Sequence, residues 1–211
     1  MTEVKKRNIS VVVIVVLYSV GVFGLLSPWR HLFQMATPIT LFISACLLIW
    51  NHVNKNWKLL WFVGVAFVVG FGSEYLGVNH QLIFGSYQYG ATLGIKFWNV
   101  PLMIGVNWFI TIYSIGSVLS SRLPLSLFVL IAGGMAVALD WLMEPVAIAY
   151  DFWRWQNGEI PLSNYAGWFG VSVFLFLLFK RADLGGRNKF ALWFLIVESL
   201  FFVVLNAASR F

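Results

Sequence analysis

The stretch PLSLFVLIAGGMAVALDWLMEPVA, residues 124–147, decides the fold class of this chain. It exceeds the roughly 20 mostly apolar residues that a helix needs to cross the hydrocarbon core of a bilayer. A single segment in lipid has to satisfy its own backbone hydrogen bonds, so the stretch is predicted to be a helix. Only Asp140 and Glu144 interrupt its apolar character, and both lie in its last third.

Apolar stretches of this kind recur throughout the chain. Of its 211 residues, 60% are hydrophobic and 10% are charged, against about 25% charged residues in ordinary soluble domains. We therefore predict one all-α membrane domain over residues 1–211, a polytopic bundle of about seven transmembrane helices. The predicted spans are residues 9–26, 34–50, 59–78, 98–119, 124–147, 166–180 and 190–208.

The basic residues lie in the gaps between these spans, or at the very end of a span for Lys180, and they predict the orientation. With the N-terminus in the cytoplasm, the cytoplasmic segments hold ten of the 14 Lys and Arg residues, and the outer segments hold Arg30, Lys96, Arg154 and Arg210. The positive-inside rule therefore predicts the N-terminus inside and the C-terminus outside. This explains the net charge of +6 without a nucleic-acid partner. The expected location is the cytoplasmic membrane of the cell, among its lipids.

Two long connections, residues 79–97 and 148–165, lie on the outer side in this topology. Both are rich in aromatic residues and glycine, with few charges, which is unlike the composition of flexible linkers. We expect them to fold back over the bundle as lids. The alternative is an ordinary aromatic belt at the membrane interface.

Five of the eight acidic residues need an explanation, because carboxylates in or beside a span are costly and usually face the bundle interior. These are Glu74, Asp140, Glu144, Asp151 and Glu198. Asp140 and Glu144 are four residues apart and share one helix face. Hydrogen bonds between helices are the structural alternative to a catalytic role.

Glu74 shares a helix face with Gly70 and Gly77, which allow a neighbour to approach its carboxyl closely. Glu74, Asp140 and Glu144 are predicted to lie at the same outer depth. Two neighbouring carboxyls in a low dielectric do not ionise together, so one is expected to keep its proton. A neutral carboxyl beside a charged one provides a general acid and a general base. These three residues are the predicted catalytic groups.

Aromatic residues around the same outer zone predict the kind of substrate. Aromatic faces stabilise cations and line sites for apolar ligands. A carboxylic acid that protonates an alkene, beside rings that stabilise a carbocation, suits acid-initiated isoprenoid chemistry. The residues predicted to bind substrate or water are Asn107, Tyr75, Tyr87, Tyr89, Trp108, Trp141, Asp151, Trp153, Trp155, Asn164 and Trp168.

Several motifs also resemble a known family. They are FGSEYLG (71–77), IFGSYQY (83–89), NVP (99–101) with NW (107–108), LDWLMEP (139–145), WRW (153–155) and IPLSNYAGW (160–168). In this order they are similar to bacterial and archaeal carotenoid-biosynthesis membrane proteins, notably carotenoid 1,2-hydratases of the CruF and bisanhydrobacterioruberin hydratase type. The resemblance implies that water adds to the terminal ψ-end C1=C2 double bond of an acyclic or monocyclic carotenoid, without a cofactor. Its polar positions correspond to Glu74, Asn107, Asp140 and Glu144.

Other functions remain as alternatives. A carotenoid cyclase would begin with the same protonation, and an internal alkene would then capture the cation. A carotenoid-binding protein without catalysis, or a proton-coupled transporter, could also use buried carboxyls, although no internal repeat is visible. A retinal protein needs a lysine in the middle of a span, and the predicted spans contain no lysine except Lys180, the last residue of 166–180. No Cys/His spacing typical of a metal site occurs.

Overall fold

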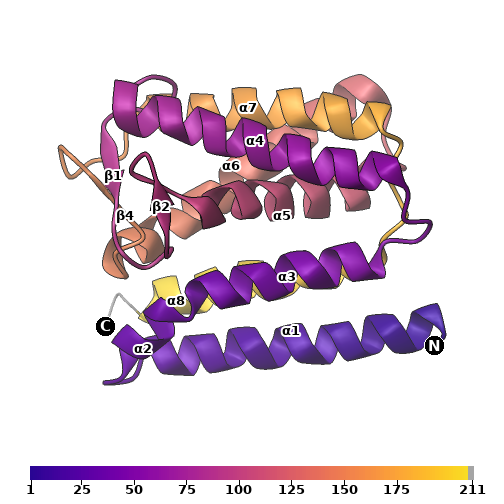
Figure 1. Cartoon of the computed structure of the whole chain (residues 1–211), viewed down its shortest axis with the longest axis horizontal. Helices are drawn as coiled ribbons and strands as arrows, with labels where there is room; N and C mark the ends of the chain where they lie inside the picture. Colours follow the sequence, from indigo (N-terminus) through magenta and orange to yellow (C-terminus); the bar gives the residue numbers. More distant parts are fainter. Residues whose placement is uncertain (209–211) are drawn as a thin grey trace.

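The computed structural model of the chain describes residues 1–208, which form eight helices and four short strands (Figure 1). The helices are α1 (Glu3–Leu25), α2 (Arg30–Met35), α3 (Thr37–Asn51), α4 (Trp57–His80), α5 (Leu102–Leu119), α6 (Leu125–Ala149), α7 (Leu162–Arg181) and α8 (Phe190–Ala208). The strands are β1 (Tyr87–Tyr89), β2 (Lys96–Phe97), β3 (Val100–Pro101) and β4 (Trp153–Trp155). The predicted all-α bundle is therefore confirmed.

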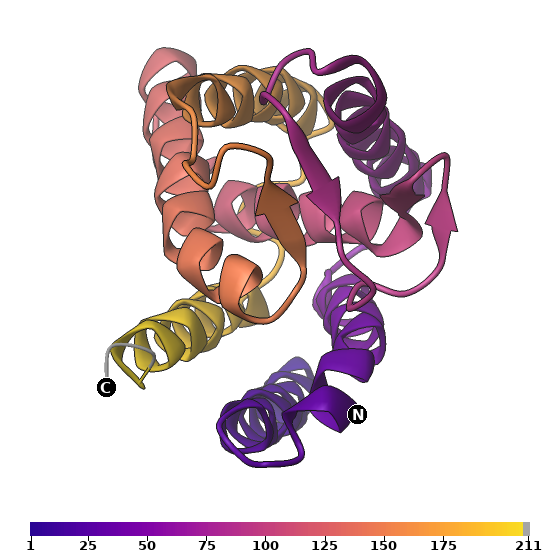
Figure 2. The same ribbon diagram turned by 90° about the vertical axis from the view of Figure 1, so that its left-hand side faces the viewer.

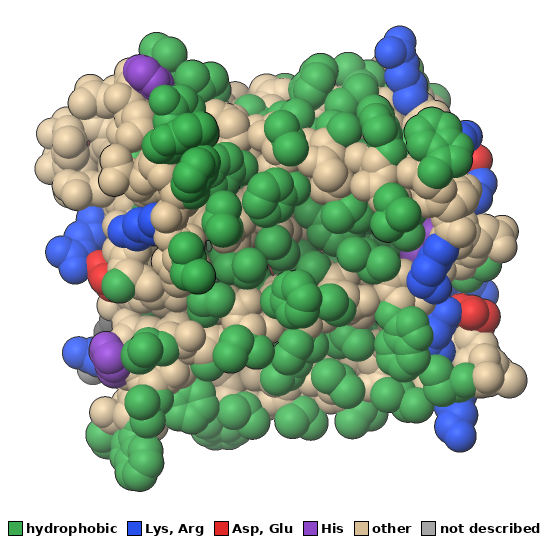
Figure 3. Space-filling model, viewed as in Figure 1, with side chains coloured by type: hydrophobic (Ala, Val, Ile, Leu, Met, Phe, Trp, Pro, Cys, Tyr) green, Lys and Arg blue, Asp and Glu red, His purple; other side chains and the backbone are tan. Residues whose placement is uncertain are grey.

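Six of these helices, all except α2 and α3, are long and apolar enough to cross a membrane. The predicted span 34–50 corresponds to α3, an apolar helix of 15 residues, with part of the short α2 before it. Large hydrophobic side chains cover the flank of the molecule, and the charged ones gather at its two ends (Figure 3). This is the surface of an integral membrane protein. Arg210, which the charge count assigns to the outer side, lies outside the described residues.

Helix α5 forms the centre of the bundle. Of an 18-residue window of α5, 72% is buried, against 28–39% in the other five long helices. Helices α4, α6 and α7 surround it on one side, and α3 and α8 pack on the other, with α1 outside them (Figures 1 and 2). A helix that is mainly apolar all round and carries no charged side chain suits a position enclosed on all sides. The helix begins at Leu102, because residues 98–101 belong to the β2–β3 hairpin.

The two long connections meet at one end of the bundle, as the lid prediction requires. Strand β1 pairs antiparallel with β4, and Tyr87 lies opposite Trp155 while Tyr89 lies opposite Trp153. Figure 2 shows the pair crossing the end of the helices. We call these two strands, Tyr87–Tyr89 and Trp153–Trp155, the lid. In both strands the outer residues are buried and the middle one is exposed, so all four aromatic side chains face the helices.

The opposite end of the bundle is held by a small polar network around His52, which follows α3. The His52 Nδ1 atom lies 2.6 Å from the Tyr113 hydroxyl, which also accepts a hydrogen bond from the Asn188 amide at 3.1 Å. Burial, with smaller effects from Arg187 and Lys55, lowers the pKa of His52 from 6.5 to about 4. The ring is therefore neutral at neutral pH, and its Nδ1 atom shares a hydrogen bond with the Tyr113 hydroxyl.

This pKa predicts that the protein loses stability in mild acid. The unfolded chain takes up a proton on His52 below about pH 6.5, whereas the folded chain does so only near pH 4. The folded state thus binds fewer protons in that interval. The free energy of unfolding therefore decreases as the pH is lowered from 7 to 4, by on the order of 3 kcal/mol. Thermal unfolding in detergent between pH 7 and pH 4 measures the effect. His52→Gln should flatten the dependence, and an unchanged slope in that variant would contradict the assignment.

Candidate active site

A small cavity lies beneath the lid, and we call it the acid cavity. Four elements and the lid contribute to it, so residues far apart in sequence face one another there. Its lining residues are Glu74, Phe84, Tyr87, Tyr89, Ile104, Asp140, Glu144, Trp153, Trp155, Asn164 and Trp168. The three predicted catalytic carboxyls therefore share one buried site.

Glu74 has hydrogen-bond donors on both of its carboxyl oxygens. The Tyr87 and Tyr89 hydroxyls donate to Oε2 at 2.5 and 2.6 Å, and the Trp108 indole N–H donates to Oε1 at 2.9 Å. Burial, followed by the charge of Glu74, raises the pKa of both tyrosines well above 10, so both hydroxyls keep their protons. Three donors around one carboxyl match the acceptor-only character of an ionised carboxylate.

Glu144 is held in the same way by the other strand of the lid. The indole N–H groups of Trp153 and Trp155 donate to its Oε2 at 3.0 and 2.9 Å. The amide of Asn164, on α7, donates to its Oε1 at 3.2 Å. The tyrosines of β1 thus donate hydrogen bonds to Glu74, and the tryptophans of β4 donate to Glu144. Both are possible because each strand directs alternate side chains into the bundle.

Asp140 differs from the other two carboxyls. Its Oδ2 accepts a hydrogen bond of 2.7 Å from the Asn164 amide, which also reaches Glu144. Its Oδ1 is buried and has no hydrogen-bond partner among the described residues. A carboxyl with one accepting oxygen and one unused oxygen suits the neutral acid, whose O–H can point at a substrate. Among residues 1–208, no group of three His, Cys, Asp or Glu side chains is placed to hold a metal ion.

Two glycines on α4 allow the Glu74 donors to reach it. A methyl group at position 70 would overlap the Cβ and Cγ atoms of Trp108, and one at position 77 would lie 2.6 Å from the Tyr87 hydroxyl. The ring of Trp108 in turn stacks on Trp168, with centroids 4.2 Å apart. The close approach predicted at Gly70 and Gly77 is thus made by Trp108 and Tyr87, two of the three aromatic groups that bind the carboxyl.

Gly70→Ala is therefore expected to displace Trp108 and to reduce both stability and activity. Overpacking of this kind costs about 1–3 kcal/mol. Gly72→Ala is the matched control, because nothing lies within 4 Å of a methyl group at position 72 on the same helix. Thermal unfolding of the two variants measures the difference. Equal midpoints would show that the Trp108 contact has no such role.

Four residues predicted to bind substrate or water lie away from the acid cavity. Trp141 is 61% exposed on the outer face of α6, and Tyr75 packs against the rings of His80 and Trp98. Asp151 forms an ion pair of 2.6 Å with Arg154 and accepts a bond from the backbone N–H of Ala91. Helix α6 ends at Ala149, two residues before Asp151, so Asp151 does not continue the Asp140–Glu144 stripe.

Asn107 is the fourth of these residues, and it faces a separate, larger pocket. Conversely, the acid cavity contains Phe84 and Ile104, which sequence reasoning did not single out. Phe84 lies within the IFGSYQY motif, and membership of that motif could have identified it as a residue of the site. Ile104 has no such signal, because an isoleucine near the start of an apolar helix resembles its neighbours. Trp108 lies behind Glu74 as a hydrogen-bond donor and stacking partner.

The fold and the site together define an integral membrane protein with three carboxyls enclosed under an aromatic lid. The family of carotenoid biosynthesis proteins matches this chain over residues 32–211. The chain therefore belongs to that family and has a role in carotenoid biosynthesis. No curated protein and no solved structure matches it.

Proposed function

We propose that this protein is a cofactor-independent carotenoid 1,2-hydratase, which adds water to the terminal ψ-end C1=C2 double bond of an acyclic or monocyclic carotenoid. The observation that carries the proposal is the contrast within the acid cavity. Glu74 and Glu144 each accept three hydrogen bonds, whereas Asp140 keeps an oxygen without a partner. One acid, two carboxylates and aromatic walls are the groups that hydration of an alkene requires.

The proposed reaction begins at Asp140. Its Oδ1–H gives a proton to C2 of the alkene, and the π electrons form the new C–H bond. The tertiary carbocation at C1 is stabilised by the surrounding rings and by the negative charge of the carboxylates. The oxygen of a water molecule then bonds to C1, and Glu144 accepts the proton that this water loses.

The cycle closes when the proton returns from Glu144 to Asp140. Asn164 donates to both side chains, at 3.2 and 2.7 Å, and so holds them beside each other for this transfer. Glu74 is proposed to remain an anion that stabilises the cation and orients water with the lid tyrosines. The net change is the addition of one water, with no electron transfer and no cofactor.

The substrate is proposed to enter from the bilayer, and water from the lid end. We propose that the lid lies on the outer face of the cytoplasmic membrane, because the distribution of the basic residues favours this orientation. Expression in cells that accumulate lycopene, followed by mass analysis of the pigments, tests the proposed reaction. A pigment heavier by one or two waters is expected. An isomer of unchanged mass would favour the cyclase, and wholly unaltered pigment bound to the protein would favour a binding role.

A further inference from the structure

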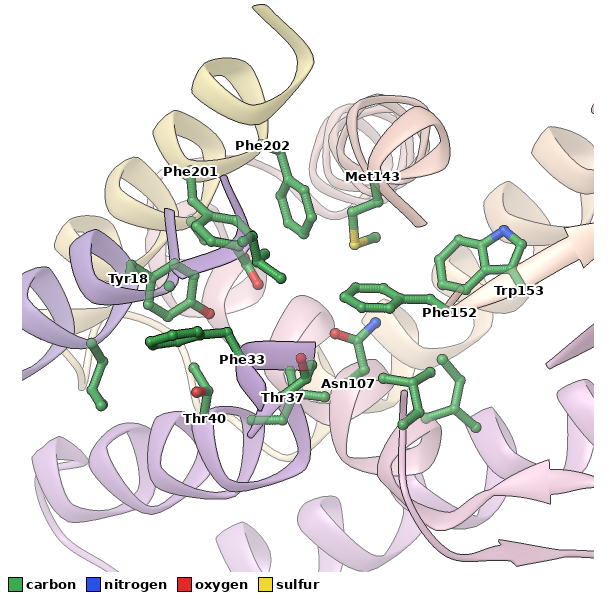
Figure 4. A pocket seen from close by; sticks show the side chains of 17 residues that line it. Tyr18, Phe33, Thr37, Thr40, Asn107, Met143, Phe152, Trp153, Phe201 and Phe202 are labelled. Atoms are coloured by element: carbon green, nitrogen blue, oxygen red, sulfur yellow. The ribbon is translucent and has the colours of Figure 1, made fainter. Parts of the chain in front are cut away.

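A second and larger pocket lies between α1, α3 and α8 on one side and α5 and α6 on the other (Figure 4). We call it the large pocket. Its walls are mainly apolar, and they include Leu17, Leu41, Met143, Phe201 and Phe202. Such a pocket, larger and more apolar than the acid cavity, suits an extended hydrocarbon.

Five polar side chains interrupt this apolar lining, namely Tyr18, Thr37, Thr40, Asn107 and Glu198, and the most unusual is Glu198 on α8. It is 2% exposed, and its Oε2 is buried without a hydrogen-bond partner among residues 1–208. Asn107 points into the same pocket, and within the described chain its side chain makes no hydrogen bond. Tyr18 lines the pocket as well. An unpaired carboxyl and an unpaired amide in apolar surroundings are costly unless a ligand binds them.

The large pocket adjoins the acid cavity. Ile104 and Trp153 line both spaces. The indole N–H of Trp153 donates to Glu144, so the ring stands between the two spaces with its polar edge on the catalytic side. A long molecule that passes Ile104 and Trp153 would have its end at Asp140 and its body in the large pocket.

We infer that the large pocket binds the polyene body of the substrate, and that Glu198 and Asn107 are the polar groups that bind oxygen substituents, hydroxyl or carbonyl, carried by that body. This inference rests on the proposed function, because the acid cavity then receives the reacting end. The favoured ligand is an isoprenoid polyene with an oxygen substituent, since Glu198 and Asn107 bring unused polar groups into a mainly apolar wall. A pure hydrocarbon would leave the Glu198 and Asn107 groups unpaired and would bind more weakly.

The first experiment measures the pigment that remains bound to the protein after purification from carotenoid-producing cells. Leu17→Trp fills the large pocket and should remove most of the bound pigment, and the smaller change Leu17→Phe should remove part of it. Val16→Trp is the matched control, because the adjacent Val16 is 54% exposed on the lipid-facing side of α1. Full pigment retention in both folded Leu17 variants would overturn the inference.

The same measurement separates this inference from the proposed function. Asp140→Asn should lose the hydrated product and still retain pigment, because Asp140 lies in the acid cavity and not in the large pocket. If the wild-type protein forms no hydrated product, the proposed reaction fails. Pigment loss in Leu17→Trp alone would still locate the polyene in the large pocket.

The second experiment tests the role of Glu198. Purified protein in detergent is titrated with a polyene hydrocarbon and with its monohydroxylated derivative of the same length. The wild type should bind the hydroxylated molecule about tenfold more tightly, the value of one good buried hydrogen bond. Glu198→Leu should abolish this preference and Glu198→Gln should keep most of it. An unchanged preference in Glu198→Leu would overturn the assignment.

Discussion

Asp140→Asn is expected to reduce the hydrated product about a hundredfold or more, which is the range for loss of a general acid. The amide has nearly the shape of the acid, and its oxygen can still accept the Asn164 hydrogen bond that Oδ2 accepts now. It has no acidic proton to give to an alkene. Product formation in carotenoid-producing cells, normalised to the amount of folded membrane protein, measures the effect.

Asp151→Asn provides the matched control for this variant. It makes the same chemical change eleven positions along the chain, at a side chain paired with Arg154 outside the acid cavity. It should leave product formation nearly unchanged, because exposed ion pairs contribute about 0–1 kcal/mol. Product from Asp140→Asn at the level of the Asp151→Asn control would exclude Asp140 as the acid.

Glu74→Leu is expected to have the largest effect on stability. It leaves the hydroxyls of Tyr87 and Tyr89 and the indole N–H of Trp108 without an acceptor, and all three residues are buried. Each unsatisfied buried donor costs about 1–3 kcal/mol, so a total on the order of 5 kcal/mol is expected. Thermal unfolding in detergent and protease cleavage within residues 79–97 measure the loss of the lid.

A double-mutant cycle tests the physical reason for this effect. Replacing Tyr87 and Tyr89 by Phe removes two of the orphaned donors, so it should cost less in the Glu74→Leu protein than in the wild type. Glu159→Leu is the control for replacing an acidic residue in general, because Glu159 is exposed in the loop after β4. Additive changes in the cycle would mean that the tyrosines and Glu74 are not coupled.

The physical chemistry of single residues made part of the candidate site predictable. Asp140 and Glu144 share a helix face because they are four residues apart. A carboxyl within a membrane span usually faces the interior of the bundle, however the other helices are arranged. Their placement with Glu74 in one cavity agrees with this reasoning. Trp141 shows the limit of this reasoning. It is next to Asp140 in sequence but points away from the acid cavity, since adjacent helical residues do not share a face.

The aromatic residues of the lid required the tertiary structure. YQY and WRW are separated by more than sixty residues, and nothing local specifies that Tyr87 pairs with Trp155 and Tyr89 with Trp153. That register decides which carboxyl each ring reaches, because it fixes the alternation of both strands over the helices. It also decides that Asp140 keeps a free oxygen while its neighbours do not.

The sequence by itself determined that the chain is a membrane bundle, because the lengths of its apolar stretches and the position of its charges follow from the bilayer alone. It also indicated which carboxyls are buried and which family the chain belongs to. Only the tertiary structure separated the acid cavity from the large pocket, placing Asp140 in one and Asn107 and Glu198 in the other. The reason is that burial depends on one helix and its surroundings, whereas a cavity depends on how several helices pack.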